Sequence, residues 1–193
     1  LRVSLPLILD LDIAAELAKL HKLAGAEFSR QVEFIAKMRV FHLVDGETDI
    51  FAAIGNSDQD YNNLMRVARK LLLYEYRVFL LPNPKKERTP DIIVERKGTY
   101  RIYDLKTITG ESSAINRLRE SIGQCNQVIL NMATNYNARQ LGKDVRQFFS
   151  MNPNALEVMI FKGTRQIIIK RNYALSPGFV KVFMMRYNSK KSR

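Results

Sequence analysis

The chain has 193 residues, of which 46% are hydrophobic, and this is enough for one good-sized domain with a buried core. No apolar run approaches the roughly 20 residues that a membrane-spanning helix needs, and no signal peptide is expected. The net charge of +12 is uneven: residues 1–58 hold 6 Lys and Arg against 9 Asp and Glu, a balance of −3, whereas residues 59–193 hold 25 against 10, a balance of +15.

This asymmetry favours a polyanion as the partner of the second part of the chain. A nucleic acid is one such partner, and a membrane surface or an acidic protein is an alternative on charge alone. The single cysteine, Cys125, excludes an internal disulfide and a cysteine-based zinc cluster. Because His21 and His42 are the only histidines, a bound metal would rely on oxygen ligands, which Mg²⁺ and Mn²⁺ prefer.

The predicted elements begin with helical structure over residues 10–40, where apolar residues repeat near a 3.6-residue period. A turn is predicted at 45–48, and a loop at 55–58 marks the point where the charge balance changes sign. The next elements are a helix over 60–75, a strand over 77–81, and a hairpin with strands 91–96 and 99–106 joined by Lys97–Gly98.

The remaining pattern predicts a long helix over 113–134, with Cys125 on its buried stripe, and a shorter helix over 139–150. Strands follow over 156–161, 165–170 and 179–186, the first two joined around Gly163. This order predicts an α/β fold in which helices flank a central mixed sheet. The expected organisation is an α-helical N-terminal segment over 1–58, a main domain over 59–175, and a basic C-terminal strand and tail over 176–193.

Two carboxylates and an ammonium group converge in the predicted hairpin. If Lys97 and Gly98 form a two-residue turn, Asp91 stands opposite Asp104, with Cβ atoms about 4.5–5.5 Å apart. Lys106 shares the face of Asp104, because side chains alternate along a strand. Opposed carboxylates repel each other, and a divalent cation would remove that penalty, polarise a phosphodiester and activate a water. Lys106 would then stabilise charge on the phosphate or help to deprotonate the water. A salt-bridge cluster on a solvated face is the alternative.

Pro90-Asp91, followed after twelve residues by Asp104-Leu105-Lys106, resembles the signature of the PD-(D/E)XK nuclease superfamily, which includes many restriction endonucleases and resolvases. In that superfamily the motif lies on a hairpin between a leading and a following helix. The resemblance implies a restriction-endonuclease-like core in which Asp91, Asp104 and Lys106 are catalytic. It also implies that Asp91 and Asp104 bind a divalent metal, Mg²⁺ in the first place, with Mn²⁺ or Zn²⁺ as alternatives.

Residues 60–171 also resemble the nuclease toxin domains at the C-termini of contact-dependent growth inhibition proteins, some of which cut tRNA and some DNA. The similar stretches include Thr89-Pro90-Asp91, Asp104-Leu105-Lys106, and the run from Ser113 through Gln124 to Leu130. The resemblance implies that Gln124 is a further catalytic residue, on the helix behind the site. It implies a delivered bacterial toxin that hydrolyses RNA, tRNA included, or DNA in the cytoplasm. An acidic immunity protein would inhibit it by covering its basic face.

One departure from the superfamily concerns the leading helix, which in many members supplies a further acidic metal ligand. Residues 61–74 contain no Asp or Glu. Asn62 or Asn63 can stand in through the side-chain carbonyl, or Asp60 can reach the site, although these residues are equally suited to the start of a helix. Without a substitute, metal affinity should be lower or the chain inactive.

Basic side chains in the second half of the chain are expected to follow the phosphate backbone of a nucleic acid. Any one of them can instead be a plain solvated charge. The predicted nucleic-acid-binding residues are Arg117, Arg119, Arg139, Lys143, Arg165 and Lys170.

Two rival functions remain open. One is a metal-independent toxin RNase that would use the basic and hydroxyl groups of Lys106, Thr107, Ser113 and Arg165. The other is a non-catalytic nucleic-acid-binding or assembly module with a decayed site. Sensitivity to EDTA separates the first from a metal-dependent nuclease, and unchanged biological activity of Asp91→Ala would favour the second.

Overall fold

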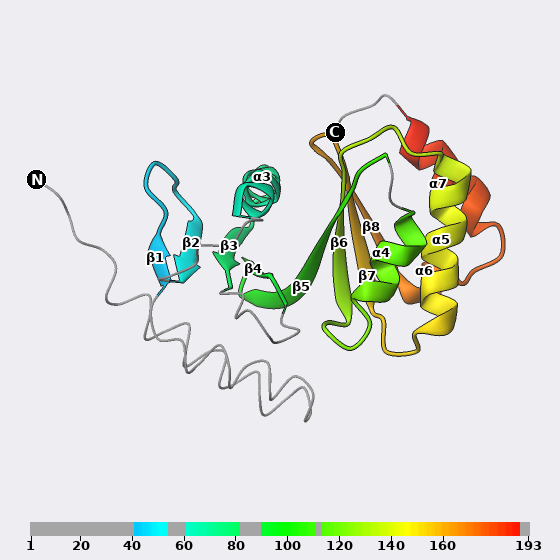
Figure 1. Ribbon diagram of the computed structural model, residues 1–193, viewed down its shortest axis with the longest axis horizontal. Helices are drawn as coiled ribbons and strands as arrows, with labels where there is room; N and C mark the ends of the chain where they lie inside the picture. The colour runs from blue at the N-terminus through cyan, green and yellow to red at the C-terminus, as the bar shows by residue number, and fades with distance from the viewer. Residues whose placement is uncertain (1–40, 54–60, 82–89, 111–112, 190–193) are drawn as a thin grey trace, which may run out of the picture. The chain divides into compact units, whose positions relative to one another are not determined.

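The computed structural model describes residues 41–53, 61–81, 90–110 and 113–189. The helix predicted over 10–40, the loop at 55–58 and Asp60 lie outside the described residues. The chain divides into two compact units, residues 1–99 and 100–193, and each combines a mixed sheet with helices in an α/β fold (Figure 1). The division predicted from the sequence placed its boundaries after residues 58 and 175 instead.

The sheet of the first unit follows the order of the chain. Its strands are β1 (Phe41–Leu43), β2 (Ile50–Ala53), β3 (Arg77–Leu80) and β4 (Ile92–Arg96). β1 pairs antiparallel with β2, β2 pairs parallel with β3, and β3 pairs antiparallel with β4. The turn predicted at 45–48 is confirmed between β1 and β2, where Gly46 has a φ of 81°.

Helix α3 (Tyr61–Leu72) confirms the helix predicted over 60–75, and it packs against β3. Its buried residues recur three and four positions apart, which gives one apolar stripe. In the sheet, the ring of Phe79 stacks on Phe51 with centroids 5.1 Å apart and meets Phe41 edge-on at 5.7 Å. The helix stripe and this aromatic cluster supply the apolar burial of the first unit.

The second unit has a four-stranded sheet with helices packed on one face. The strands are β5 (Thr99–Ile108), β6 (Gln127–Met132), β7 (Glu157–Lys162) and β8 (Arg165–Lys170). β5, β6 and β7 are parallel neighbours, and β8 is antiparallel to β7, so the strands predicted over 156–161 and 165–170 are confirmed. The helices are α4 (Ala114–Glu120), α5 (Ala138–Met151), α6 (Arg171–Ala174) and α7 (Phe179–Asn188).

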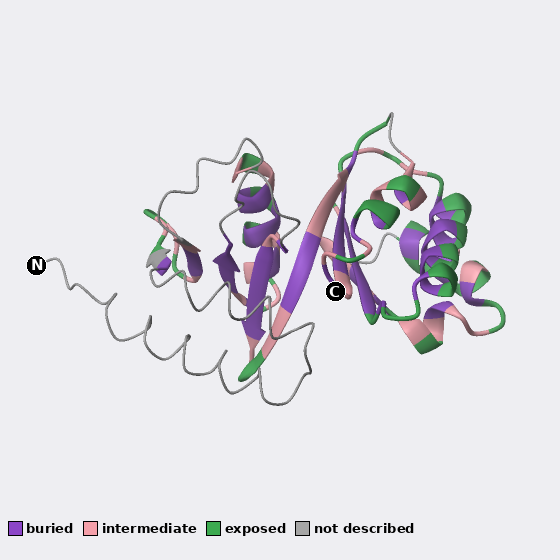
Figure 2. Ribbon diagram, turned by 60° about the horizontal axis from the view of Figure 1, so that its bottom comes forward, coloured by how far each residue is buried: buried purple, intermediate pink, exposed green. Residues whose placement is uncertain are grey.

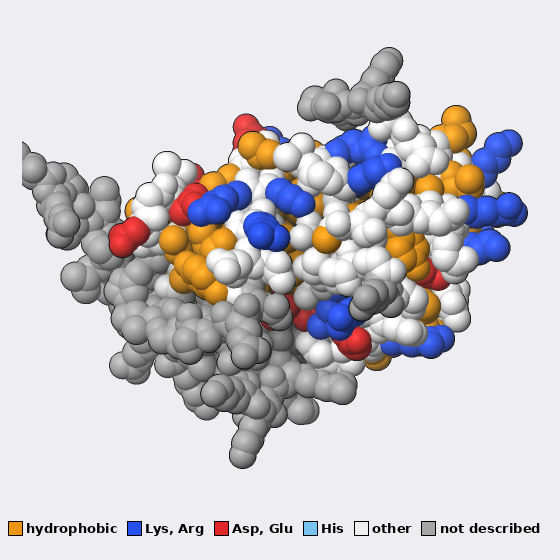
Figure 3. Space-filling model, turned by 45° about the horizontal axis from the view of Figure 1, so that its top comes forward, with side chains coloured by type: hydrophobic (Ala, Val, Ile, Leu, Met, Phe, Trp, Pro, Cys, Tyr) orange, Lys and Arg blue, Asp and Glu red, His pale blue; other side chains and the backbone are white. Residues whose placement is uncertain are grey.

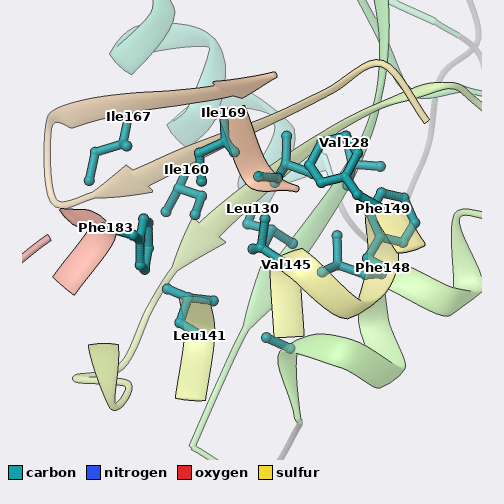
Figure 4. Packing of buried hydrophobic residues seen from close by; sticks show 14 of the residues in the cluster. Val128, Leu130, Leu141, Val145, Phe148, Phe149, Ile160, Ile167, Ile169 and Phe183 are labelled. Carbon is teal, nitrogen blue, oxygen red and sulfur yellow. The ribbon is translucent and has the colours of Figure 1, made fainter. Parts of the chain in front are cut away.

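The core of the second unit lies between its sheet and helices α4, α5 and α7, which Figure 1 shows on one side of β6, β7 and β8. Val128, Leu130 and Ile160 point from the sheet towards Leu141 of α5 and Phe183 of α7 (Figure 4). The central strands β6 and β7 are buried along most of their length, whereas β5 and β8 are only partly buried (Figure 2). Among the described residues, no helix is long and apolar enough to cross a membrane.

The long helix predicted over 113–134 is wrong. α4 ends at Glu120, Gly123 adopts a positive φ of 83° in the turn that follows, and residues 127–132 form the central strand β6. The apolar residues of a short helix and of a strand buried on both faces happened to fall at spacings of three and four. Such a strand reads as a continuous apolar run without alternation, and periodicity alone does not separate it from a buried helix.

The strand predicted over 179–186 is also wrong, because these residues belong to helix α7. Phe179, Phe183 and Tyr187 are buried at spacings of four, which is the helical period. The β-branched residues Val180 and Val182 favoured a strand, but packing against α5 determines the local structure here.

The N-terminal segment predicted as helical over 1–58 contains a β-hairpin in its described part. β1 and β2 pair antiparallel with Phe41 opposite Ala53 and Leu43 opposite Phe51. The alternation is too short to stand out in the sequence, since β1 has three residues and β2 has four. Pairing of β2 with β3, which lies more than twenty residues further on, stabilises it.

Helices α5 and α7 approach each other closely at Gly142. A Cβ atom at this position would lie 2.9 Å from Phe183 Cδ1 and 3.4 Å from Val180 Cγ1. Contacts this short are repulsive, so α5 requires a residue without a side chain where α7 crosses it. The ring of Phe183 has little room to move, because it packs between Phe179 and Tyr187, with centroids 5.7 Å and 5.6 Å away.

Replacing Gly142 by valine should lower the free energy of unfolding by about 1–3 kcal/mol, since the added methyl groups overpack the contact with α7. Urea unfolding followed by circular dichroism measures this change. The matched control is Gln147→Val, which puts the same β-branched residue at an exposed position of α5 and should cost only a few tenths of a kcal/mol. Equal losses in the two variants would mean that the contact does not constrain the helices.

Candidate active site

Asp104 and Lys106 lie on the same face of β5, as the alternation of side chains along a strand predicts. Lys106 Nζ stands 3.0 Å from Asp104 Oδ2 and 3.3 Å from Asp104 Oδ1. The Asp104 side chain is 1% exposed and that of Lys106 is 16% exposed. The alternative's salt bridge between these two residues is therefore present, but it is largely buried and does not lie on a solvated face.

The register of β5 explains why this pair is buried. Asp104 pairs with Val128 of β6 and Lys106 pairs with Leu130, and side chains of paired residues project from the same face of a sheet. Val128 and Leu130 belong to the core beneath the helices. A carboxylate placed there loses its hydration, at a cost of several kcal/mol unless an opposite charge replaces the water. Lys106 supplies that charge.

Asp91, the first predicted metal ligand, precedes β4 and is half-buried, and its carbonyl oxygen accepts a hydrogen bond from the Leu81 amide at 2.9 Å. The two-residue turn predicted after β4 is confirmed. Lys97 and Gly98 have φ values of 51° and 76°, and a type I′ hairpin turn requires a positive φ at both positions. The expected opposition of Asp91 and Asp104 joins residues of the two units, and it stays a prediction.

Gln124, predicted to be catalytic on the helix behind the site, lies instead in the turn that follows α4. Its Nε2 atom donates a hydrogen bond to the Glu120 carbonyl oxygen at 2.7 Å. The last carbonyl groups of a helix have no partner within the helix, so this amide satisfies one of them. The positive φ of Gly123 ends the helix before Gln124, and this glycine was the signal in the sequence.

Cys125 is a core residue, as predicted, and it shows where this turn meets β5. Its thiol donates a hydrogen bond to the Ile102 carbonyl oxygen at 3.1 Å. Burial in the first place, and the negative charge of Asp104 to a smaller extent, raise the pKa of the Cys125 thiol to about 12. The turn after α4 therefore packs against β5, and the charge of the Asp104 carboxylate acts on the Cys125 thiol.

A second buried charge cluster, which the sequence did not reveal, occupies the opposite face of β5. The Tyr103 hydroxyl donates to Glu157 Oε1 at 2.6 Å, and Arg101 Nη1 lies 3.4 Å from Glu157 Oε2. Burial, followed by the Glu157 charge, raises the pKa of Tyr103. Tyr103 faces away from Asp104, as alternation along a strand requires, and is part of the core. An acidic residue at the head of an apolar strand was the available signal.

The predicted nucleic-acid-binding residues fall into two groups. Arg119, Arg139, Lys143 and Lys170 are exposed. Arg117 forms an ion pair with Glu120 at 3.0 Å, and both side chains remain largely in solvent. These five residues are all accessible to a ligand.

Arg165, the sixth of these residues, is turned towards the protein. Its guanidinium group donates to the carbonyl oxygens of Tyr187 and Ser189 at the end of α7. Lys162 donates to the same Tyr187 oxygen at 3.1 Å, and its ammonium lies 4.2 Å from the centre of the Tyr187 ring. Cations at a helix C-terminus donate hydrogen bonds to carbonyl groups that have no partner within the helix. They also interact favourably with the negative end of the helix dipole. Both residues therefore hold α7 in place.

The residues of the metal-independent alternative have other contacts. Thr107 follows Lys106 directly on β5 and so projects from the opposite face. Ser113 caps α4, with its side-chain oxygen accepting a hydrogen bond from the Asn116 amide at 3.2 Å. Arg165 is occupied at the end of α7. Ser113 and Arg165 thus stabilise the ends of helices, Thr107 faces away from Lys106, and the described contacts do not bring these residues together around Lys106.

The donor set suits a metal that needs few protein ligands. Within the described ranges, no group of three or more His, Cys, Asp or Glu side chains could hold a metal ion. Mg²⁺ usually keeps several waters and binds through one or two carboxylates together with substrate phosphates. Asp104 is one carboxylate of that kind, and the resemblance adds Asp91. One or two carboxylates would fit Mg²⁺ better than Zn²⁺, which takes three or four protein ligands.

Comparisons of this chain with protein-family models, with curated proteins and with solved structures give no match.

Removing the ammonium group alone should destabilise the second unit more than removing both charges. Lys106→Met leaves the buried Asp104 carboxylate without its cation, and we expect a loss of about 3 kcal/mol in the free energy of unfolding. Asp104→Asn combined with Lys106→Met should recover part of that loss. Urea unfolding of the wild type, of Lys106→Met, of Asp104→Asn and of the double variant gives the coupling energy.

The control for this comparison is Arg117→Met, which breaks the exposed pair with Glu120 and should cost less than about 1 kcal/mol. Equal costs for Lys106→Met and Arg117→Met would contradict the burial of the Asp104–Lys106 pair.

The Cys125 thiol should be unreactive in the folded protein, because its pKa of about 12 leaves almost no thiolate near pH 8 and because it is buried. Ellman's reagent at pH 8 should react with one thiol per chain only after urea is added. Full reaction of the native protein within minutes would show that the turn after α4 opens readily.

Proposed function

We propose that the protein is a metal-dependent nuclease that hydrolyses phosphodiester bonds of RNA or DNA. The observation that carries the proposal is the buried Asp104–Lys106 pair, an acid and a cation 3.0 Å apart on adjacent same-face positions of one strand. The order of elements from α3 to β6 supports it. A helix, three strands, a helix and a strand follow one another, as the resemblance to the PD-(D/E)XK superfamily leads one to expect.

The roles of the residues follow from their chemistry. The carboxylates of Asp104 and Asp91 would hold the cation, Mg²⁺ in the first place. When bound, the metal polarises the phosphodiester and lowers the pKa of a water. The Lys106 ammonium stabilises the negative charge that develops on the phosphate oxygens during attack by water. Its partly buried position strengthens that interaction, because fewer solvent dipoles screen it.

The charge distribution of the second unit supports a polyanionic substrate. Its described residues include 13 Lys and Arg but only 4 Asp and Glu, a balance of +9. Three of those acids, Asp104, Asp144 and Glu157, are buried and bonded to neighbouring side chains. Glu120 is the one described acid of this unit that is exposed. Basic side chains are therefore far more frequent than acidic ones on the surface (Figure 3).

The leading helix favours weak metal binding in the absence of substrate. α3 has no acidic residue in its first turn. Asn62 is exposed and Asn63 is half-buried at that position, and an amide carbonyl is a neutral, weaker oxygen ligand. We therefore infer that substrate phosphate completes the coordination, so activity should need millimolar rather than micromolar Mg²⁺.

The same basic surface and the resemblance support a toxin that is delivered into the bacterial cytoplasm and restrained by an acidic immunity protein. Such a partner should copurify with the tagged chain from its source cell at low salt and dissociate as salt rises. Recovery of basic or uncharged partners alone would count against this part of the proposal.

Cleavage of tRNA, bulk RNA and plasmid DNA should require Mg²⁺ or Mn²⁺ and stop in EDTA. Asp104→Asn, which keeps the shape of the side chain, should reduce the rate by about 100-fold or more, and so should Asp91→Asn and Lys106→Met. The matched control is Asp45→Asn, which removes an exposed carboxylate from the turn between β1 and β2 and should leave cleavage unchanged.

Two results would overturn the proposal. Cutting that persists in EDTA or in Asp104→Asn would favour the metal-independent RNase. Absence of cutting of every substrate, by a folded wild-type protein, would favour the non-catalytic module.

A further inference from the structure

The outer surface of α5 carries a stripe of three cations. Arg139, Lys143 and Arg146 are all exposed, and their spacings of four and three residues place them on one side of the helix. The opposite side of α5 contributes Leu141, Val145 and Phe148 to the core. The stripe, defined here as Arg139, Lys143 and Arg146, therefore points away from the sheet and into solvent.

The stripe contains no compensating acid. Asp144 is the single acidic residue of α5, and it is buried. Its carboxylate oxygens accept hydrogen bonds from the Tyr136 hydroxyl at 3.0 Å and from Gln140 Nε2 at 2.7 Å. The one negative charge of the helix is thus directed inwards, and the positive field of the stripe extends into solvent.

The arrangement of these cations works against the stability of the helix itself. Like charges three and four residues apart repel one another. Arg139 also lies in the first turn of α5, where the helix dipole disfavours a positive charge, while the last turn, where a cation would be favourable, has none. A surface shaped only by folding would interleave acids or move the cations to the C-terminus. The observed placement points to a bound anion that compensates for these costs.

The chemistry of the residues beside the stripe points to the backbone of a duplex. Gln147 is an exposed polar neighbour of the stripe on α5, and such a group commonly donates hydrogen bonds to phosphate oxygens. No exposed position of α5 carries an aromatic side chain. Surfaces that bind single strands use aromatic rings as stacking platforms, whereas a duplex keeps its bases stacked and offers its phosphates.

We propose that the stripe on α5 binds the phosphate backbone of double-stranded nucleic acid, independently of sequence and of the Asp104–Lys106 site. Three adjacent cations spaced by one helical turn match consecutive phosphates along one strand of a duplex. This surface does not rest on the nuclease proposal, because it would bind whether or not the protein cuts.

The test compares two triple variants of the full chain that lose the same charge. The stripe variant is Arg139→Gln, Lys143→Gln and Arg146→Gln, and glutamine preserves helix propensity. The control variant is Arg66→Gln, Arg69→Gln and Lys97→Gln, which removes three exposed cations of the first unit. Both are made in the Asp104→Asn background and measured in EDTA, so cleavage plays no part. Circular dichroism verifies that each variant is folded.

Fluorescence anisotropy with labelled duplex DNA, duplex RNA and single strands of the same sequence gives the affinities at several salt concentrations. We expect the stripe variant to bind a duplex at least about 10-fold more weakly near 0.1 M salt, and the control variant to lose less than about threefold. The slope of log affinity against log salt should become shallower by about 2 to 3, since each phosphate contact contributes about 0.9. Loss on either DNA or RNA supports the proposal and identifies the preferred duplex.

Equal losses in the two triple variants would overturn the proposal, because net charge alone would then explain binding. Tighter binding to single strands than to both duplexes would overturn it as well. So would a stripe-dependent attachment to phosphatidylserine vesicles without a stripe-dependent attachment to duplexes. None of these results bears on whether Asp104 supports cleavage, so the two proposals fail separately.

Discussion

Strand β5 carries charged side chains on both faces of a buried sheet, and each charge is matched inside the same unit. Asp104 meets Lys106 on the face that the helices cover, and Arg101 and Tyr103 meet Glu157 on the other face. A shift of β5 by one residue would move the Asp104–Lys106 pair to the other face and would separate Arg101 and Tyr103 from Glu157 of β7. Because an uncompensated buried charge costs several kcal/mol, the register of β5 is fixed, and with it the position of the candidate site.

This matching also determines the charge that the second unit presents to its surroundings. Its three buried acids serve as internal partners: Asp104 for Lys106, Glu157 for Tyr103 and Arg101, and Asp144 for Tyr136 and Gln140. Some cations are likewise engaged, as Arg165 is at the end of α7. The remainder, including the stripe on α5, are left in solvent with little opposing charge. One distribution of acids therefore stabilises the fold and produces a surface that attracts polyanions.

The sequence predicted those parts of the fold that depend on local patterns. The type I′ turn at Lys97–Gly98, the stripes of α3 and α5, and the hairpin of β7 and β8 each follow from a few neighbouring residues. The shared face of Asp104 and Lys106 follows in the same way from alternation. The errors arose where distant packing decides. β6 is a strand because it pairs with β5 and β7, and α7 is a helix that packs against α5. The position of Glu157 at the head of an apolar strand indicates a buried acid, but not that its partner is Tyr103, 54 residues away.

The close crossing of α5 and α7 at Gly142 links the charged surface to the apolar interior. With no side chain at Gly142, α5 can settle against Val180 and Phe183 at one rotation about its own axis. α7 is held in turn by Lys162 and Arg165, which bind the carbonyl groups at its end. The direction in which Arg139, Lys143 and Arg146 project thus depends on Gly142, on the ring of Phe183, and on the two cations that bind the end of α7. A bulkier residue at Gly142 would rotate α5 about its axis. The side chains of the stripe would then no longer align with the phosphates of a nucleic-acid backbone.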